Sequence, residues 1–290
     1  ALVQEALAQT PASYTLHRVD GKTVEVGGDK RVYGSLVTDP WIIDYATQRP
    51  RRPVLDDIVR HTRLGDALPV VDMIHRMDMP PADVAPETAY VRSLEAYATN
   101  TTKHLVSLPS SDESTRDWLE VAQILAGGKS LRERPIMSLG VAVTSPLQFT
   151  QVNANVLKAA VENGLPVLMV DCVMAGTTSP LSFAGSLLMS IAENLFLLTM
   201  TQVLAPGNAF IFGAGPSLTD LRTGFDVYYN ADKMLWKAAT IQMGKYYYVP
   251  ITGECGGSLV GRYDIQAGME HGLLMLPTIA CGQNLMNGLG

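Results

Sequence analysis

From about residue 68 onward, the chain alternates short apolar runs with segments in which apolar residues recur at helical spacing. Short apolar strands separated by helices are typical of a parallel sheet with right-handed crossovers. Seven such units in series, without a switch point, favour a barrel over an open doubly wound sheet. The seven predicted strands are residues 70–74, 104–107, 136–141, 167–170, 209–212, 247–251 and 274–279.

The first 64 residues follow a different pattern. Short alternating pieces flank turn signals at residues 20–21 and 27–28, which indicates a small antiparallel β element. We therefore divide the chain into an N-terminal α/β extension, residues 1–64, and a (β/α) barrel, residues 65–290. No eighth strand is apparent before Gly290. The predicted fold class is α/β, a (β/α)8 TIM-type barrel that is incomplete at its C-terminus.

Composition narrows the possible partners and compartments. The 290 residues are 47% apolar, enough to bury one large core. The net charge is -6 and no run of lysines or arginines occurs, so we expect no nucleic-acid partner. The three cysteines lack C-x-x-C spacing, and we predict neither a bound metal nor disulfides. With no signal peptide at the start and an odd number of cysteines, we expect a cytoplasmic protein. Separately, we expect it to form a homo-oligomer.

One long apolar segment, residues 181–204, could be mistaken for a membrane span. Glu193 and Asn194 lie at its centre. A charge in mid-span is costly in lipid. We therefore predict a buried helix and no membrane association.

Barrel enzymes place their chemistry at the C-terminal ends of the strands. Asp171 and Glu254 follow predicted strands in apolar surroundings, which makes both candidates for catalytic carboxylates. A structural ion pair is the alternative for each of them. Glycines gather after the later strands, at residues 213–215 and 253–257, so a large group could approach the backbone closely there.

Several common cofactor motifs are missing. In the sequence that begins Gly213-x-Gly215, Leu218 stands where the third glycine of a dinucleotide-binding motif would fall. Neither a P-loop nor a G-x-S-x-G motif is present. We therefore expect no bound nicotinamide and no S-adenosylmethionine.

Three stretches carry a family resemblance. They are residues 139–147, residues 163–185 and residues 264–270. The second contains A-G-T-T-S-P-L and the third reads D-x-Q-A-G-x-E, and this pair is fairly specific. In this order the stretches resemble the trimethylamine methyltransferase family. The resemblance implies a (β/α)8 barrel that passes a methyl group to a separate corrinoid protein.

The best-known members of that family carry pyrrolysine and demethylate trimethylamine, whereas many relatives lack it and act on quaternary amines such as glycine betaine. This sequence contains only the twenty standard residues, and we expect the corresponding position near residues 256–258. A quaternary ammonium leaves as a neutral tertiary amine and needs no prior activation. The resemblance thus implies methyl transfer from a quaternary amine to the Co(I) corrinoid of a partner protein.

A trimethylammonium group is usually held by aromatic faces, sometimes with a carboxylate nearby. Three aromatic residues fall near predicted strand ends, and Glu254 could supply the carboxylate. For each aromatic ring, packing in the core is the alternative interpretation. For His104, the alternative is a structural histidine whose ring nitrogens are hydrogen-bonded inside the barrel. The predicted substrate-binding set is Phe149, Phe212, Tyr248, His104, Ser258 and Gln266.

Two other functions remain open at this point. One is a non-catalytic module that binds a betaine or a corrinoid, and the other is a different barrel enzyme that acts on a small metabolite. Catalysis needs an open path from the ligand to an entrance of corrinoid size. A binding module could instead close over its ligand.

The missing glycine motif leads to a first prediction. Isothermal calorimetry should detect no micromolar binding of S-adenosylmethionine or of a nicotinamide dinucleotide, because no complete strand–turn–helix phosphate site occurs. Micromolar binding of either compound would refute this interpretation of the sequence.

Overall fold

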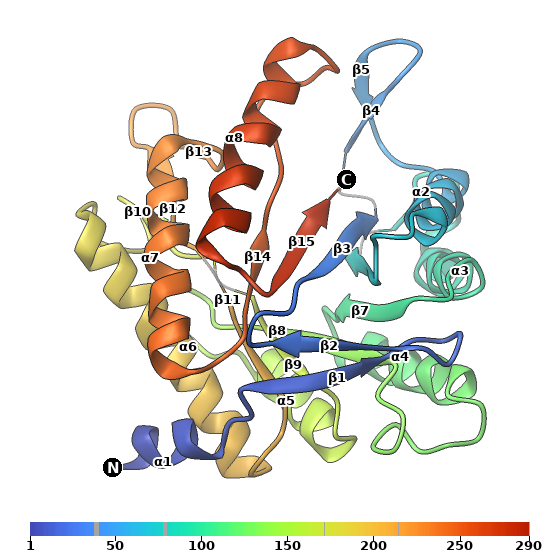
Figure 1. Ribbon diagram of the computed structural model, residues 1–290. Helices are drawn as coiled ribbons and strands as arrows, with labels where there is room; N and C mark the ends of the chain where they lie inside the picture. The colour runs from blue at the N-terminus through green and yellow to red at the C-terminus, as the bar shows by residue number, and fades with distance from the viewer. Residues whose placement is uncertain (38–40, 78–79, 171, 214, 290) are drawn as a thin grey trace.

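The computed structural model describes residues 1–37, 41–77, 80–170, 172–213 and 215–289. Within this part of the chain, eight parallel strands form a closed barrel (Figure 1). The prediction of a (β/α)8 barrel is confirmed. In order around the barrel, the strands are β3 (Val32–Val37), β6 (Met73–Met77), β7 (His104–Leu108), β8 (Met137–Ala142), β9 (Val167–Val170), β11 (Phe210–Gly213), β14 (Ile251–Glu254) and β15 (Leu285–Leu289).

The barrel is closed, and in this respect the prediction of an incomplete barrel was wrong. β15 pairs with β3 in parallel, with Leu285 opposite Val32. The first barrel strand therefore comes from the segment that we expected to lie outside the barrel. It contains Gly34, which breaks the apolar run; a Cβ atom there would lie 3.1 Å from the Met73 side chain. Glycine is used because the barrel interior is crowded at this point.

The predicted strand at residues 274–279 is part of a helix, α8 (Ile265–Cys281). A short apolar run cannot be assigned to a strand or to a buried helix from periodicity alone. The strand that actually follows, β15, contains Asn287 and Gly288 and so has no continuous apolar signal. The strands β3 and β15 were therefore missed because small or polar residues interrupt their apolar pattern.

Helices surround the barrel, and each packs against the next from α2 to α8. Side chains cap several of them: Ser111, Thr150, Ser182, Asn230 and Asp264 accept hydrogen bonds from the first turn of their helices. Between α8 and α2 the described chain places no helix, and β15 and β3 face outward there (Figure 1). The other ring helices are α2 (Leu55–Ala67), α3 (Pro86–Ala98), α4 (Asp112–Leu125), α5 (Gln151–Glu162), α6 (Phe183–Leu204) and α7 (Ala231–Tyr247).

A hairpin closes the N-terminal end of the barrel. Its strands β1 (Ser13–His17) and β2 (Thr23–Gly27) are antiparallel, which confirms the small β element predicted there. Leu16 and Val26 are fully buried against apolar side chains of the barrel interior. The short helix α1 (Leu2–Gln9) packs against α6. With this end filled, the open end lies at the carboxyl ends of the strands.

Additional short strands lie at the C-terminal end of the barrel, opposite the N-terminal hairpin. A hairpin of β4 (Ile42–Asp44) and β5 (Arg49–Arg51) rises beside α2. A small sheet is built from the strands that follow β9 and β11. Its members are β10 (Met174–Ala175), β12 (Ser217–Asp220) and β13 (Phe225–Val227).

Helix α6 is long and apolar enough to cross a membrane by length and composition, and half of its most apolar window is buried. Two polar residues at its centre, Glu193 and Asn194, explain why this helix packs in the protein core. The fully buried Glu193 carboxylate accepts hydrogen bonds from Ser145 Oγ at 2.7 Å and from the Leu147 amide at 2.9 Å. Asn194 Oδ1 accepts one from the Gly213 amide at 2.8 Å. The two residues fasten the loop after β8 and the end of β11, as expected for a core helix.

This arrangement predicts a large effect of Glu193→Ala. The substitution leaves the Ser145 hydroxyl and the Leu147 amide without their acceptor, which should lower the free energy of unfolding by roughly 2–4 kcal/mol. Denaturant titration measures it. The control is Glu162→Ala, whose partner Lys158 is 3.7 Å away and exposed, and it should cost less than about 0.5 kcal/mol. Equal losses in the two variants would contradict the structural role of Glu193.

Candidate active site at the barrel mouth

Three barrel strands bring polar side chains together at the C-terminal mouth. Glu254 is the last residue of β14, Asn287 lies on β15, and His75 lies on β6. The Asn287 amide nitrogen donates to His75 Nδ1 at 2.7 Å, across the intervening strand β3. At Gly34 on β3 an added Cβ would lie 3.3 Å from Asn287 Oδ1. The glycine therefore leaves room for this contact.

Glu254 is the centre of a cluster of charged and polar groups. The Tyr228 hydroxyl donates to one carboxylate oxygen, Oε1. Oε2 lies 3.5 Å from Lys237 Nζ and 3.6 Å from Lys233 Nζ. The two lysines are one turn apart on α7 and share a face of that helix. Their side chains are 1% and 0% exposed, whereas that of Glu254 is 30% exposed and so reaches the open mouth.

The protonation states follow from burial and pairing. Burial raises the pKa of Glu254, but the charges of Lys233 and Lys237 and the Tyr228 hydrogen bond outweigh it and lower that pKa to about 2. Burial lowers the pKa of Lys237 to about 8, because the Glu254 charge offsets it only in part. Burial also lowers the pKa of His75 to about 4. At neutral pH the cluster thus holds a carboxylate and a neutral imidazole.

Small and inert groups surround the cluster. Gly215, at φ +127°, lies beside the aliphatic stems of both lysines, and Gly288, at φ +73°, lies beside Glu254. Only glycine adopts such backbone angles without strain. Burial raises the pKa of the Cys255 thiol to about 11, so it stays protonated and unreactive. Of the glycines predicted to gather after the later strands, Gly215 lies beside this cluster, whereas Gly257 lies against the Tyr229 ring.

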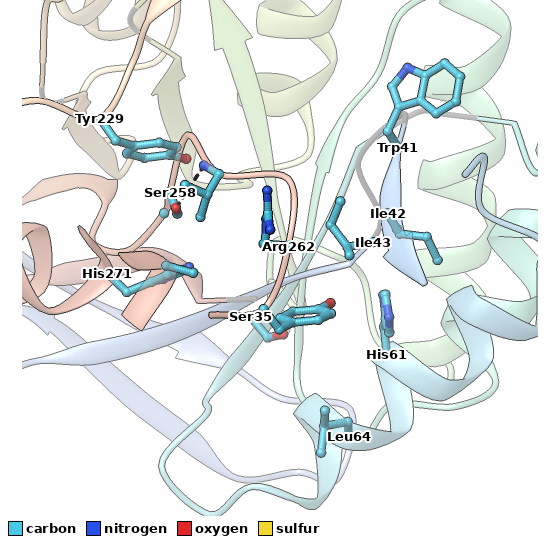
Figure 2. Close-up of a pocket in the computed structure, with 14 residues that line it drawn as sticks. Ser35, Trp41, Ile42, Ile43, His61, Leu64, Tyr229, Ser258, Arg262 and His271 are labelled. Carbon is cyan, nitrogen blue, oxygen red and sulfur yellow. Dashed lines mark hydrogen bonds between the residues drawn. The ribbon is translucent and has the colours of Figure 1, made fainter. Parts of the chain in front are cut away.

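A separate cavity of about 450 Å³ lies between α2 and α8, outside the barrel (Figure 2). Figure 2 shows His61 and Leu64 entering it from α2, and His271 from α8. The part of its lining that is described includes three aromatic residues, one arginine and no carboxylate. Its remaining lining residues are Ser35, Trp41, Ile42, Ile43, Tyr229, Gly257, Ser258, Val260, Arg262, Tyr263 and Ala267.

The predicted aromatic residues do not meet at the mouth. Phe149 packs edge-on against Phe196 of α6, with ring centroids 5.3 Å apart. Phe212 is fully buried in the layer between strands and helices. Tyr248 is 80% exposed at the end of α7, before β14 begins, and so lies at the opposite end of the barrel. The structure thus assembles no cage from these three rings.

The other predicted residues are also dispersed. His104 bonds to the His17 carbonyl and to Ser138 Oγ beside the N-terminal hairpin, as a satisfied barrel histidine. Ser258 lines the outer cavity and donates to Glu270, and Gln266 donates to the same carboxylate. Asp171 lies outside the described residues. Glu254 alone lies at the mouth, where its catalytic role stays a prediction.

The sequence interpretation missed the partners of Glu254. The signal available was the pair Lys233 and Lys237, four residues apart in a chain with only 17% charged residues. Tyr228 and Asn287 gave no signal, because nothing local tells which way their side chains point.

The fold and the mouth are those of a (β/α)8-barrel protein with its ionisable groups at the carboxyl ends of the strands. The family model described as trimethylamine methyltransferase (MTTB) matches residues 1–288. The chain belongs to the trimethylamine methyltransferase family.

Characterised relatives cover the whole chain. It is 29% identical to the trimethylamine methyltransferase MttB of Desulfitobacterium hafniense over 100% of this chain and 58% of that protein. It is 28% identical to the glycine betaine methyltransferase of the same species, strain Y51, over 98% and 60%. It is 23% identical to the proline betaine:corrinoid methyltransferase of Eubacterium limosum over 96% and 59%. The chain thus spans about 60% of the length of these relatives.

Solved structures agree with the fold. The monomethylamine methyltransferase of Methanosarcina barkeri superposes with a TM-score of 0.63 at 16% identity, over 99% of this chain and 61% of that chain. The dihydropteroate synthase of Yersinia pestis superposes with a TM-score of 0.55 at 12% identity, over 94% and 91%. At such identities the likeness shows the barrel fold alone.

The Glu254 cluster predicts a specific pH dependence. The pKa of Glu254 in the folded protein, about 2, lies below the ordinary value of 4.5 for a glutamate, so its stabilisation is present above pH 4.5 and is lost as pH falls towards 2. The difference in unfolding free energy between the native protein and Glu254→Gln should therefore be largest above pH 5 and shrink below it. Denaturant titrations across pH measure this. Glu120→Gln, on the exposed face of α4, is the control and should show little pH dependence. A Glu254→Gln difference that grows on acidification would contradict the ion-pair assignment.

Proposed function

We propose that this chain transfers a methyl group from a quaternary amine, glycine betaine or a similar compound, to the Co(I) corrinoid of a partner protein. The observation that carries the proposal is the family match over residues 1–288, with relatives named for glycine betaine and for proline betaine and corrinoid. We favour a quaternary amine over trimethylamine because these 290 residues are all of the twenty standard types.

The reaction requires little general acid or base catalysis from the protein. The corrinoid, when bound, supplies Co(I) as the nucleophile. The C–N electron pair leaves with the nitrogen, which departs as a neutral tertiary amine and needs no proton at that moment. The contribution of this chain is to orient the ammonium group and to shape the electric field around it.

Glu254 suits a substrate cation that must lose its charge. Charge disperses from the nitrogen as the methyl group leaves, so a site that binds the cation too tightly would raise the barrier. The Glu254 carboxylate reaches the mouth, but two lysines and Tyr228 already share its charge. It therefore attracts the ammonium group only moderately.

The mouth also fits the approach of a large planar group. Glycines follow the ends of β11 and β14, and Gly215 and Gly288 hold backbone angles that side chains rarely adopt. Such positions let a bulky ligand come close to the backbone.

The proposal predicts a substrate preference. The purified protein should methylate Co(I) corrinoid with glycine betaine and hardly at all with trimethylamine, because only the quaternary nitrogen leaves neutral. The formation of methylcobalamin, followed by absorbance over a panel of amines, measures this.

Variants separate the mouth from the rest of the barrel. Glu254→Gln should lower kcat/KM by roughly 5- to 30-fold, equivalent to about 1–2 kcal/mol. Tyr248→Ala, at the opposite end, should leave it unchanged. Equal rates with trimethylamine and glycine betaine would overturn the substrate assignment. Tight betaine binding without any methyl transfer would favour the non-catalytic module instead.

A further inference from the structure

The buried donors that have no acceptor among the described residues include two of the Glu254 cluster, Lys233 Nζ and His75 Nε2. Lys233 is 0% exposed and its Nζ lies 3.6 Å from Glu254, beyond hydrogen-bonding distance, and 3.3 Å from the centre of the Tyr228 ring. His75 is 6% exposed. A buried donor left without an acceptor is destabilising and uncommon.

The proton position on His75 follows from its neighbours. The Gly288 amide donates to Asn287 Oδ1 at 2.9 Å, which leaves the Asn287 amide nitrogen to face the imidazole. That nitrogen can only donate, so His75 Nδ1 accepts. In the neutral ring the proton then resides on Nε2. His75 Nε2 is therefore a donor, like Lys233 Nζ.

The charges of the cluster also indicate that an anionic acceptor is missing. Two lysine ammonium groups face one carboxylate, whose Oε1 accepts a hydrogen bond from Tyr228 and whose Oε2 accepts one from Lys237. Lys233 contributes only its charge, at 3.6 Å from Oε2. The cluster therefore has an excess of positive charge and of donors. Glu254 also acts electrostatically on His75, so the imidazole belongs to the same cluster. A ligand that contributes an anionic acceptor would correct both imbalances.

We propose that Lys233 and His75 bind an anionic group of the substrate, a carboxylate. This rests on the proposed function and adds which residues recognise the carboxylate that a betaine carries beside its quaternary ammonium group. The two oxygens of a carboxylate can serve the two free donors, while Glu254 faces the ammonium end. A purely cationic amine would leave both donors buried and unsatisfied. Lys233 and His75 are thus the residues that determine specificity.

Equilibrium binding tests this without requiring turnover. Calorimetry compares glycine betaine with choline, which has the same trimethylammonium group but a hydroxyl in place of the carboxylate. The native protein should bind glycine betaine at least about 30-fold more tightly, because sites built around polar groups reject analogues that lack the matching group. Lys233→Met and His75→Phe should each lose most of that preference.

Two further variants control for folding and for ring shape. Lys245→Met, on the same helix α7 but exposed, with its ammonium bonded to the Cys281 carbonyl, should keep the native preference. His75→Gln retains an N–H donor and should keep more of the preference than His75→Phe. Equal affinity for the two amines in the native protein, no binding of glycine betaine, or an unchanged preference in both Lys233→Met and His75→Phe would overturn the proposal. Selective betaine binding without methyl transfer would support the carboxylate site and refute the proposed reaction.

Discussion

The hydrogen bonds between β15 and β3 close the barrel, and the polar mouth depends on that closure. They join residues near both ends of the described chain, with Leu285 opposite Val32. Only in a closed barrel does Asn287 on β15 reach His75 on β6, across the gap that Gly34 leaves in β3. The pairing of β14 with β15 places Glu254 beside Asn287 and so on the same side of the seam. A sheet left open at this seam would separate the imidazole from the carboxylate.

Within the closed mouth, one carboxylate makes two buried ammonium groups tolerable. Lys233 and Lys237 are almost completely buried, which is costly for a charge without a partner, and Glu254 is the acid that lies within 4 Å of both. The arrangement also weakens Glu254 as a cation site. That suits a reaction in which the substrate loses its positive charge, and it leaves donors free for an anionic group.

The barrel and the burial of α6 could be predicted from sequence because they rest on repeated features: apolar strand and helix alternation, and a central Glu193 in an apolar helix. Strands β3 and β15 could not be predicted, because glycine and asparagine inside a strand interrupt the apolar pattern. Glu254 was found because the end of a strand is a fixed place in a barrel. The aromatic cage failed because neighbouring strand residues point to opposite sides, and Phe212 points into the helix layer. The position of Lys233 and Lys237 at the mouth could not be predicted, because it depends on how helix α7 is rotated about its axis.

Isotope transfer is the most direct test of the central claim that this mouth moves a methyl group from a betaine to a corrinoid. Glycine betaine with ¹³C in its N-methyl groups is incubated with the protein and a Co(I) corrinoid partner protein, and both products are quantified by mass spectrometry. The account predicts one labelled methyl group on cobalt for each dimethylglycine released. Dimethylglycine released without label on the corrinoid, or no label transferred at all, would contradict it.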